Sequence, residues 1–439
     1  MAYRVGLYTL GCKVSQYETE AVAEAFVGAG FELCSFKDVC DVYVVNTCTV
    51  TAESDRKSRQ IIRRANRTNP EALIMVMGCY SERSASEVLG LRGVACVIGT
   101  EGKMRLPEKA LALLAERQSS GRVFPIASVL PLENAVFEPM TVKSAPRTRA
   151  YVKIEDGCEC RCTYCAISLA RGNVRSKRAE DILAEIQGLC DGGTREVVLT
   201  GIETSSYGAD FSSYGLIDLL EKIEKESPVS RIRLGSLSPE WLKMDVIDRL
   251  SALSKLTPHF HLSVQSGSSA VLRNMKRRYN KEMALSSVLA LREQIPTVEF
   301  TADMMVGFPG ETQEDFEETM DFARQAAFLD MHVFAYSPRK GTPAASFEGQ
   351  IDEETKKERS ARLSALGKEL TRQRQQNRIF KAEPLKVLFE TEKGGLWRGH
   401  SDEFFEVEAF SQENLHGALC SVLPLSVKNG RLQGTIVKE

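Results

Sequence analysis

The first hundred residues alternate between short apolar segments and more polar, helical ones. Residues 3–10 are strand-like, and the segments at 42–45 and 72–77 are apolar throughout rather than alternating with polar residues. Helical patterns at 16–29 and 53–67 separate these segments. Apolar strands separated by helices predict a parallel sheet that helices cover on both faces.

From residue 151 the alternation resumes and continues for six units. A helical pattern follows each expected strand. Six such units fit a partial barrel of the TIM type, in which the loops at the C-terminal ends of the strands carry the site. The expected strands are 151–155, 196–200, 231–236, 259–264, 298–306 and 331–336.

A charged helix is expected at 352–380, and the pattern after it changes. Short strands split by glycine-containing turns predict a small antiparallel barrel. These strands are expected at 385–390, 404–409, 418–423 and 432–437.

The predicted fold class is therefore α/β, with an N-terminal parallel α/β sandwich, a central partial (β/α)6 barrel and a small C-terminal β-barrel. At 439 residues the chain is too long for one ordinary domain. The expected parts are an N-terminal domain at 1–115, a linker at 116–145, a central core at 146–375 and a terminal barrel at 376–439.

The composition favours a soluble globular protein of the cytoplasm. The chain is 43% hydrophobic and 26% charged, and it contains no apolar run of membrane-spanning length and no signal-peptide core. Its net charge of −2 shows no overall excess of positive charge of the kind that favours nucleic-acid binding. An RNA partner therefore has to be argued from local basic patches. In a reducing compartment, twelve cysteines favour metal or redox chemistry over disulfides.

Three cysteines with the spacing CxxxCxxC, Cys158, Cys162 and Cys165, give the strongest chemical signal. Thiolates favour iron–sulfur clusters, which normally take four cysteines. Three ligands from one loop leave one iron open to an exchangeable ligand, where chemistry can take place. The spacing matches the signature of the radical S-adenosylmethionine (radical SAM) enzymes. Cys160 lies inside this loop and is expected to be a bystander.

A second set of cysteines follows the apolar segments of the N-terminal part. Cys12, Cys48 and Cys79 each lie just past the C-terminal end of an expected strand. In a parallel sheet these ends share one edge, where α/β proteins bind ligands. The three cysteines are therefore expected to meet and to hold a second three-ligand cluster. The alternative is that they are three buried small apolar residues, a common fate of free cysteine.

The chain resembles the radical SAM methylthiotransferases over nearly its whole length. These enzymes add a methylthio group to tRNA or to a ribosomal protein, and they have an N-terminal cluster domain, a radical SAM core and a C-terminal TRAM barrel. The matching fragments are 10–18, 45–50, 77–79, 170–172, 199–202, 264–268, 306–312 and 334–344.

The fragment at 10–18 is similar to the branch of this family that acts on N6-threonylcarbamoyladenosine in tRNA. It reads Gly11-Cys12-Lys13 followed shortly by Gln16-Tyr17-Glu18, whereas the isopentenyladenosine branch tends to carry Gly-Cys-Gln-Met-Asn. Two departures stand out: Ser15 replaces the usual Asn, and Ser168-Leu169 replaces the usual Pro-Tyr. No contact from a proline or tyrosine is therefore carried over to 168–169.

The resemblance implies two 4Fe-4S clusters and S-adenosylmethionine (SAM) as cofactors. An electron delivered to the cluster on the CxxxCxxC loop would cleave SAM to a 5′-deoxyadenosyl radical, which removes hydrogen from carbon 2 of the adenine. The cluster on the strand-end cysteines would hold the sulfur that is passed on, and another SAM would supply the methyl group. Both clusters must face one pocket, so the N-terminal domain is expected to cap the mouth of the barrel.

The expected partners follow from the same resemblance. They are the anticodon stem-loop of tRNA, modified at position 37, a low-potential electron donor such as flavodoxin or ferredoxin, and a sulfur donor. The protein is expected to be a monomer without a membrane partner.

The resemblance also points to residues that contact SAM. Those at the C-terminal ends of the barrel strands are expected to bind the methionine amine and the ribose, and Arg171 is placed to meet a carboxylate or phosphate. As alternatives, the glycines serve turns and Glu311 caps the next helix. The candidates are Tyr164, Arg171, Gly201, Glu203, Gln265, Gly307 and Glu311.

Local basic patches are candidates for RNA contact. Four arginines share one face of the early helix, and a second basic cluster at 276–278 has an aromatic residue beside it. In the terminal barrel, Trp397 and Arg398 are expected to belong to a stacking surface. Phosphate neutralisation needs such cations and base stacking needs such rings; the alternative is a set of solvated charged faces. The candidates are Arg56, Arg59, Arg63, Arg67, Lys276, Arg277, Arg278, Trp397 and Arg398.

Three functions compete at this stage. The first is methylthiolation of threonylcarbamoyladenosine at position 37 of tRNA. The second keeps the chemistry but takes isopentenyladenosine in tRNA or a ribosomal protein as its substrate. The third is a non-catalytic iron–sulfur protein that binds RNA or senses redox state. The three-ligand count at both sites disfavours the third, because a structural cluster gains from full coordination.

Overall fold

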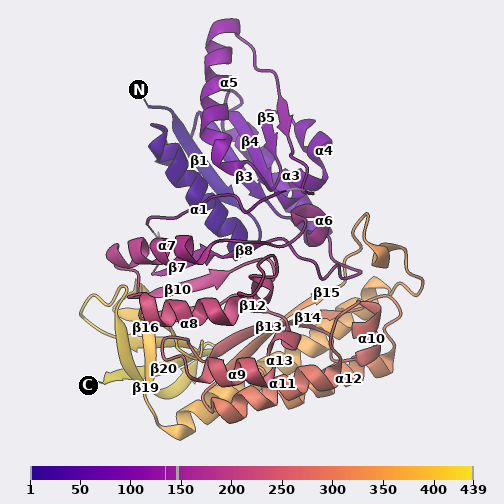
Figure 1. Ribbon diagram of the computed structural model, residues 1–439, viewed down its shortest axis with the longest axis vertical. Coiled ribbons are helices and arrows are strands. Elements are labelled where there is room, and N and C mark those ends of the chain that lie inside the picture. The colour runs from indigo at the N-terminus through magenta and orange to yellow at the C-terminus, as the bar shows by residue number, and fades with distance from the viewer. Residues whose placement is uncertain (1, 134, 145–147, 438–439) are drawn as a thin grey trace.

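The computed structural model describes residues 2–133, 135–144 and 148–437. Figure 1 shows an N-terminal α/β domain above a central open barrel, with a small C-terminal β-barrel beside the core. The boundary expected between residues 145 and 146, and residues 438–439 of the terminal barrel, lie outside the described residues. Within the described ranges, no helix is both long enough and apolar enough to cross a membrane.

The N-terminal sheet has the order β2-β1-β3-β4-β5-β6, and its described strand pairs are parallel, which confirms the predicted parallel sheet. The order reverses between β1 and β3, so a topological switch point lies at their C-terminal ends. The strands are β1 (Arg4–Thr9), β2 (Glu32–Cys34), β3 (Val42–Thr47), β4 (Leu73–Gly78), β5 (Val94–Ile98) and β6 (Ile126–Ser128).

Helices cover both faces of this sheet because its strands carry apolar side chains on both sides. They are α1 (Lys13–Gly28), α2 (Ala52–Thr68), α3 (Cys79–Arg83), α4 (Ala85–Leu89), the short η1 (Lys103–Arg105) and α5 (Leu106–Ser120). On β3, Val42 and Val44 pack with side chains of α1 and α5, whereas Tyr43 and Val45 pack with side chains of α2 and α4. Because successive side chains of a strand point to opposite faces, one apolar strand contributes to the hydrophobic cores on both sides of the sheet.

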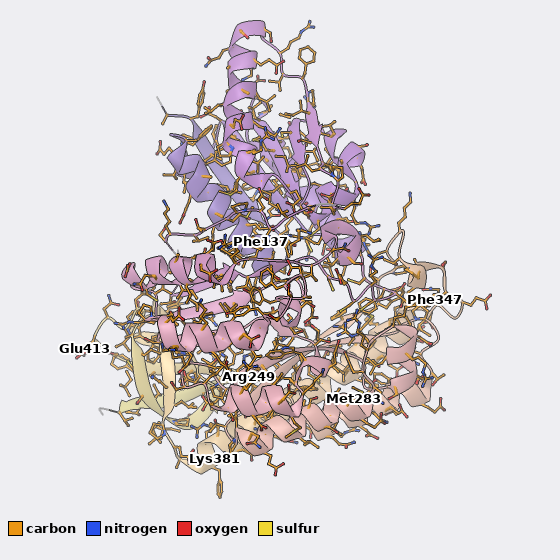
Figure 2. All side chains as sticks on the ribbon, viewed as in Figure 1. Phe137, Arg249, Met283, Phe347, Lys381 and Glu413 are labelled. Atoms are coloured by element: carbon orange, nitrogen blue, oxygen red, sulfur yellow. A yellow bond between two sulfur atoms is a disulfide. The ribbon has the colours of Figure 1, made fainter. Side chains whose placement is uncertain are left out.

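Part of the expected linker packs with the N-terminal domain. α5 continues to Ser120, and residues 126–128 form the edge strand β6 beside β5. Further along, Phe137 lies at the junction between the N-terminal domain and the core, as Figure 2 shows. The ammonium of Lys153 stands 5.3 Å from the centre of the Phe137 ring. This segment thus packs along the junction of the two domains.

The central open barrel consists of two parallel sheets whose strands follow in chain order, β7-β10-β11 and β12-β13-β14-β15. The six expected β/α units are confirmed, although Gly235 interrupts the third strand and divides it into β11 and β12. The barrel strands are β7 (Arg149–Lys153), β10 (Glu196–Thr200), β11 (Arg231–Leu234), β12 (Ser236–Leu237), β13 (His259–Gln265), β14 (Glu299–Val306) and β15 (Asp330–Ala335). A separate two-stranded ribbon pairs β8 (Glu155–Asp156) with β9 (Arg175–Ser176).

Helices pack on the outside of the barrel through apolar faces. α8 shows the cause, because Leu216, Leu219, Leu220 and Ile223 recur at helical spacing and are all buried. These helices are α7 (Ala179–Asp191), α8 (Leu216–Glu226), α9 (Met244–Ser251), α10 (Ser269–Asn274), α11 (Lys281–Gln294) and α12 (Gln313–Ala326). The short helix α6 (Ile167–Arg171) lies instead at the junction with the N-terminal domain, where it packs with α3. The core also contains the short 3-10 turns η2 (Thr204–Ser206), η3 (Pro239–Trp241) and η4 (Pro343–Ser346).

The charged helix α13 (Glu353–Lys381) leads from the core into a closed terminal barrel of order β16-β17-β18-β20-β19. Four of its pairings are antiparallel as expected, but β18 and β20 close the barrel in parallel. The strand β17 adds to those that the sequence predicts. The strands are β16 (Leu385–Lys393), β17 (Leu396–Ser401), β18 (Glu406–Phe410), β19 (Leu419–Lys428) and β20 (Arg431–Val437).

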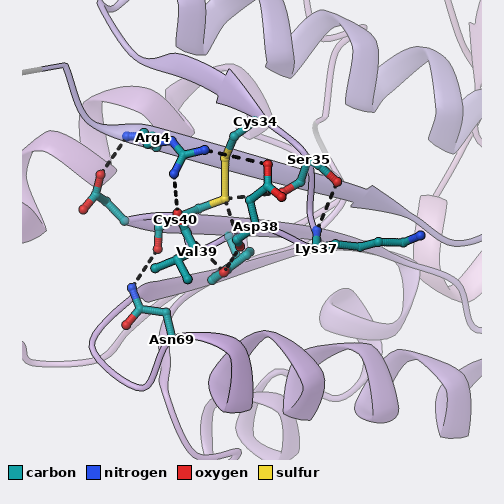
Figure 3. The surroundings of a disulfide bond; sticks show 10 residues. Arg4, Cys34, Ser35, Lys37, Asp38, Val39, Cys40 and Asn69 are labelled. Carbon is teal, nitrogen blue, oxygen red and sulfur yellow. Dashed lines mark hydrogen bonds and ion pairs between the residues drawn. A yellow bond between two sulfur atoms is a disulfide. The ribbon is translucent and has the colours of Figure 1, made fainter.

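One cysteine pair departs from the expectation that cysteines serve metals rather than disulfides. Cys34 at the end of β2 and Cys40 before β3 form a disulfide, shown in Figure 3. The surrounding backbone is held in place, since Arg4 donates to the carbonyl oxygen of Val39 at 2.9 Å and Asn69 donates to that of Cys40 at 2.9 Å. The connection between two strands that are consecutive in the chain brings these cysteines together, which their spacing alone does not reveal.

Candidate active site

A cavity of about 300 Å³ lies between the N-terminal domain and the mouth of the barrel. Both domains contribute cysteines to its wall, as expected if the N-terminal domain caps the barrel. The structure therefore brings the six predicted ligands together, although their role as ligands stays a prediction. The six are Cys12, Cys48, Cys79, Cys158, Cys162 and Cys165.

The N-terminal cysteines follow the ends of β1, β3 and β4. Cys12 is the exposed N-cap of α1, whereas Cys48 and Cys79 are buried. Parallel pairing brings these strand ends to one edge, at the switch point of the sheet. Gly11 and Gly78 precede two of the cysteines with φ of +116° and +101°, so the chain leaves the sheet in a conformation that favours glycine.

Gly78 permits the turn that presents Cys79. A Cβ at this position would lie 2.6 Å from the carbonyl oxygen of Thr47. We expect Gly78→Ala to lower the free energy of unfolding by about 2–4 kcal/mol, because backbone strain and a steric clash add. Thermal unfolding beside Gly28→Ala tests this, since Gly28 has open space around it and its alanine variant should match wild type. Equal melting temperatures for the two variants would contradict the prediction.

The sulfur of Cys79 accepts a hydrogen bond from Nε of Arg171 at 3.2 Å. Arg171 ends α6, and its side chain is fully buried. Burial raises the pKa of the Cys79 thiol to about 12, while the Arg171 guanidinium favours the thiolate. Because a metal-bound cysteine is a thiolate, a cationic donor at this sulfur suits a metal ligand.

Arg171 also belongs to a buried ion network that joins the two domains. Its guanidinium contacts the carboxylate of Glu18 in α1 at 2.5 Å and that of Asp156 in β8 at 3.1 Å. The Glu18 carboxylate also contacts the ammonium groups of Lys103 at 3.2 Å and Lys153 at 2.9 Å. Burial would raise the pKa of Glu18, but the three cations, Arg171 foremost, hold it well below its ordinary value. Glu18 is therefore an ionised carboxylate that fixes α1 to the core.

The loop between β8 and α6 carries the second set of cysteines. The sulfur of Cys162 accepts a hydrogen bond from Arg277 at 3.3 Å, and that of Cys165 accepts one from the backbone N–H of Ile167 at 3.4 Å. Each cysteine set thus has one arginine beside a sulfur. Hydrogen bonds of this kind stabilise thiolates and tune iron–sulfur clusters.

The donor set fits a polynuclear cluster. In the described part of the chain, no three His, Cys, Asp or Glu side chains are grouped closely enough to share a single metal ion. A 4Fe-4S cluster takes one cysteine per iron, so its ligands stand farther apart than those of a single ion. Two sets of three thiols with cationic donors beside them are the ligands that such clusters use.

Cys160 also lines the cavity. It shares a hydrogen bond with Cys158, which raises the pKa of Cys158 and lowers that of Cys160. Its role as a bystander stays a prediction.

Four of the predicted SAM contacts lie in the cavity wall: Tyr164, Gly201, Glu203 and Gln265. Burial raises the pKa of Glu203, and its carboxylate accepts a hydrogen bond from Ser205 at 2.5 Å. These residues lie on the loops at the C-terminal ends of barrel strands, where TIM-type folds place their sites.

The other three predicted contacts are engaged elsewhere and form no part of the cavity wall that the described residues make. Arg171 is held in the ion network. The carboxylate of Glu311 accepts a hydrogen bond from the N–H of Gly307 at 2.9 Å and contacts Arg359 of α13 at 2.6 Å. Glu311 thus ties the loop after β14 to α13 in this structure.

Two family models match the chain. Residues 152–323 match the radical SAM superfamily, and residues 4–99 match the Uncharacterized protein family UPF0004. The first match contains the CxxxCxxC loop, and the second contains the three strand-end cysteines.

The chain is 39% identical over 440 residues to the threonylcarbamoyladenosine tRNA methylthiotransferase MtaB of Bacillus subtilis (strain 168), which covers 99% of this chain and 96% of that protein. The chain belongs to the radical SAM methylthiotransferase family. It is also 33% identical to the tRNA-2-methylthio-N(6)-dimethylallyladenosine synthase of Bacillus cereus (strain AH187), over 98% of this chain and 85% of that protein.

Among solved structures, this methylthiotransferase resembles a radical S-adenosylmethionine methyltransferase, TsrM, from Kitasatospora setae with cobalamin and a 4Fe-4S cluster bound. The TM-score is 0.57 at 18% identity, over 79% of this chain and 77% of that one. The likeness shows a shared fold. Membership of the radical SAM family implies SAM and a 4Fe-4S cluster as cofactors, and the cysteines of the 158–165 loop have the donor chemistry for that cluster.

The basic residues that the sequence proposes for RNA contact divide between the surface and the interior of the methylthiotransferase. On α2, Arg56, Arg63 and Arg67 are exposed, whereas Arg59 donates to the hydroxyl of Tyr80 at 3.0 Å. After α10, Lys276 and Arg278 are exposed, but Arg277 turns inward to Cys162 and the cavity.

Trp397 does not fit the expected stacking surface of the terminal barrel. Only 8% of the residue is exposed, and it packs in the barrel core with Phe389 and Phe405. Its place on β17 turns the ring inward, because successive side chains of a strand point to opposite faces. The neighbouring Arg398 points outward and contacts Glu408 at 2.6 Å.

The methylthiotransferase also has polar groups at the cavity that the sequence motifs did not indicate. Asp303 of β14 lines the wall, and its carboxylate lies 3.3 Å from Nε2 of His261 and 3.5 Å from Nδ1 of His332. Burial opposes ionisation, but the two histidines hold the pKa of Asp303 below its ordinary value. The available signal was that His261 and Asp303 belong to strands in which polar residues stand at alternate positions.

Proposed function

We propose that this methylthiotransferase adds a methylthio group to carbon 2 of N6-threonylcarbamoyladenosine at position 37 of tRNA. The observation that carries the proposal is the similarity to MtaB of Bacillus subtilis over 99% of the chain. The cavity that both cysteine sets line supports the same chemistry, since sulfur transfer needs both sets to act on one bound adenosine. The similarity to the dimethylallyladenosine synthase is lower and covers less of that protein.

Cys158, Cys162 and Cys165 are the proposed ligands of the SAM-binding cluster. When bound there, a 4Fe-4S cluster supplies the electron that cleaves SAM reductively. Arg277 donates to the Cys162 sulfur, so it stabilises the thiolate form of one ligand. The partly enclosed wall keeps the reaction away from bulk water.

Glu203 and Gln265 are the proposed contacts for the bound SAM. The carboxylate of Glu203 is suited to accept hydrogen bonds from the methionine amine, and Gln265 to meet the ribose hydroxyls. Tyr164 and Gly201 shape the same part of the wall. The buried positions of Glu203 and Gln265 hold their side chains in place before the cofactor binds.

Cys12, Cys48 and Cys79 are the proposed ligands of a second 4Fe-4S cluster, which supplies an open iron for the sulfur that is transferred. Arg171 orients the sulfur of Cys79 through its 3.2 Å hydrogen bond. The ion network around Glu18 then keeps this set facing the barrel.

We further propose that the exposed arginines of α2 and the terminal TRAM-type barrel contact the anticodon stem-loop. Arg56, Arg63 and Arg67 are suited to phosphates, and Arg398 lies on the outside of the terminal barrel. A low-potential flavodoxin or ferredoxin and a separate sulfur donor complete the proposed partners of a cytoplasmic monomer.

Anaerobic turnover with defined RNAs tests the proposed function. The reconstituted protein, with SAM and dithionite, is offered stem-loops that carry threonylcarbamoyladenosine or isopentenyladenosine at position 37, and the nucleosides are analysed by mass spectrometry. We expect the methylthio product from the first RNA only. Product from the second RNA alone would reassign the substrate. Absence of 5′-deoxyadenosine with both would favour a non-catalytic iron–sulfur protein.

A further inference from the structure

Lys13 is a cation beside the cavity without a neutralising partner. It is the first residue of α1 and directly follows Cys12, which lines the cavity. Its side chain is half-buried, yet among the described residues its ammonium has neither a hydrogen bond nor an ion pair. Cations that leave bulk water are normally paired, so an unpaired one next to a cavity-lining residue points to an anionic ligand.

The charges nearest to Lys13 come from the barrel strands. The positive charges of Arg233 and Arg149 act on Lys13 from strands β11 and β7. Both arginines have carboxylates of their own, since Arg233 contacts Glu196 at 2.9 Å and Arg149 contacts Glu390 at 2.9 Å. Of these three cations, Lys13 is the one that forms no ion pair among the described residues. A bound anion would reduce the unfavourable positive potential around it.

Asp303 supplies the opposite chemistry in the same region. Its carboxylate lines the cavity and attracts Lys13 electrostatically without forming an ion pair with it. Its close contacts are His261 and His332. Beside the two cysteine sets, the site therefore offers a cation and a separate hydrogen-bond acceptor.

We propose that Lys13 and Asp303 form a subsite for an amino-acid side arm on the substrate adenosine. Lys13 pairs with the carboxylate of the arm, and Asp303 accepts a hydrogen bond from its hydroxyl or amide N–H. This inference rests on the proposed function, whose threonylcarbamoyl substrate carries these groups. An apolar isopentenyl arm would leave the charge of Lys13 without a partner, which is how polar sites reject analogues that lack the polar group.

The test compares two stem-loops that differ only in the threonyl carboxylate, which is free in one and converted into a carboxamide in the other. Reconstituted wild-type protein should favour the free carboxylate by about 30-fold or more in kcat/KM, because the carboxamide loses a desolvated charge pair. Lys13→Gln should bring this ratio close to one, and Lys13→Arg should keep most of it. The equilibrium affinity for the two RNAs, measured by fluorescence anisotropy, should show the same pattern.

Lys222→Gln is the matched control. Lys222 lies on the outer helix α8 and contacts Glu180 at 3.3 Å, so this variant loses one positive charge away from the cavity and should keep the full ratio. Asp303→Asn should weaken the binding of both RNAs about tenfold and leave their ratio intact, because it acts on the N–H or O–H donors of the arm. Unchanged binding would remove Asp303 from the subsite.

Two outcomes would overturn the role of Lys13. If Lys13→Gln lowers activity equally with both RNAs, the preference for the carboxylate RNA over the carboxamide RNA is unchanged. The substitution then acts through the neighbouring Cys12 and not through the carboxylate of the arm. If it raises the KM for SAM and keeps the ratio, Lys13 binds the methionine carboxylate instead. Failure of wild-type protein to modify either RNA would contradict the proposed function, and the ratio of affinities would still decide the subsite.

Discussion

Replacing Cys158, Cys162 and Cys165 with alanine will abolish the reductive cleavage of SAM and halve the bound iron. The reason is that these three thiols are the proposed anchors of the cluster that supplies the electron. Wild-type protein reconstituted without oxygen is expected to hold about eight irons per chain, four in each cluster. Iron analysis and detection of 5′-deoxyadenosine by liquid chromatography measure the two effects.

The alanine variants of Cys12, Cys48 and Cys79 separate the two sites. They should also hold about four irons, but should still cleave SAM while forming no methylthio product. Cys420→Ala in β19 is the matched control, since this cysteine lies in the terminal barrel and should leave the iron content unchanged. Full iron content after removal of the N-terminal cysteines would contradict a second cluster.

Glu18→Gln will destabilise the protein by about 3–5 kcal/mol, because it removes the carboxylate that three buried cations share. Glutamine keeps the shape of the side chain, so the loss reports charge rather than packing. Arg171 loses its shortest contact, at 2.5 Å, and its hold on Cys79 weakens with it. Denaturant unfolding under anaerobic conditions measures the loss, and iron retention in the N-terminal set should fall in parallel.

Glu108→Gln in the first turn of α5 is the control for this variant. Its carboxylate is 74% exposed and lies 3.7 Å from Arg105, so solvent screens the pair and its loss should cost less than about 1 kcal/mol. Equal losses of stability in the two variants would show that the buried ion network contributes no more than an exposed ion pair.

The main elements of the fold could be predicted because apolar runs and glycine turns mark them. Four apolar residues indicate the strand β3, and a polar, basic run that Asn69-Pro70 ends indicates α2. α1 begins at Lys13, three residues before the predicted start at residue 16. The sequence does not reveal this start because the N-cap residue, Cys12, is not a usual capping residue and makes no side-chain cap. The strand β17 was missed because Arg398 and His400 are polar and only alternate residues are buried.

Some residues of the candidate site can also be predicted from the sequence, and others cannot. The cysteines were predicted from local spacing and from strand ends, both of which are written along the chain. The position of Arg277 was not, because an inward arginine and a surface arginine have the same sequence context. Lys13 and Asp303 come from different domains, and only the docking of α1 on the barrel brings their charges together.

The central claim is that SAM cleavage and sulfur transfer act on one adenosine in one cavity. The most direct test uses a threonylcarbamoylated stem-loop that carries deuterium at carbon 2 of the modified adenosine, with mass spectrometry of the 5′-deoxyadenosine formed. The account predicts that deuterium moves from carbon 2 into 5′-deoxyadenosine as the methylthio product appears. Methylthio product accompanied by unlabelled 5′-deoxyadenosine would contradict it.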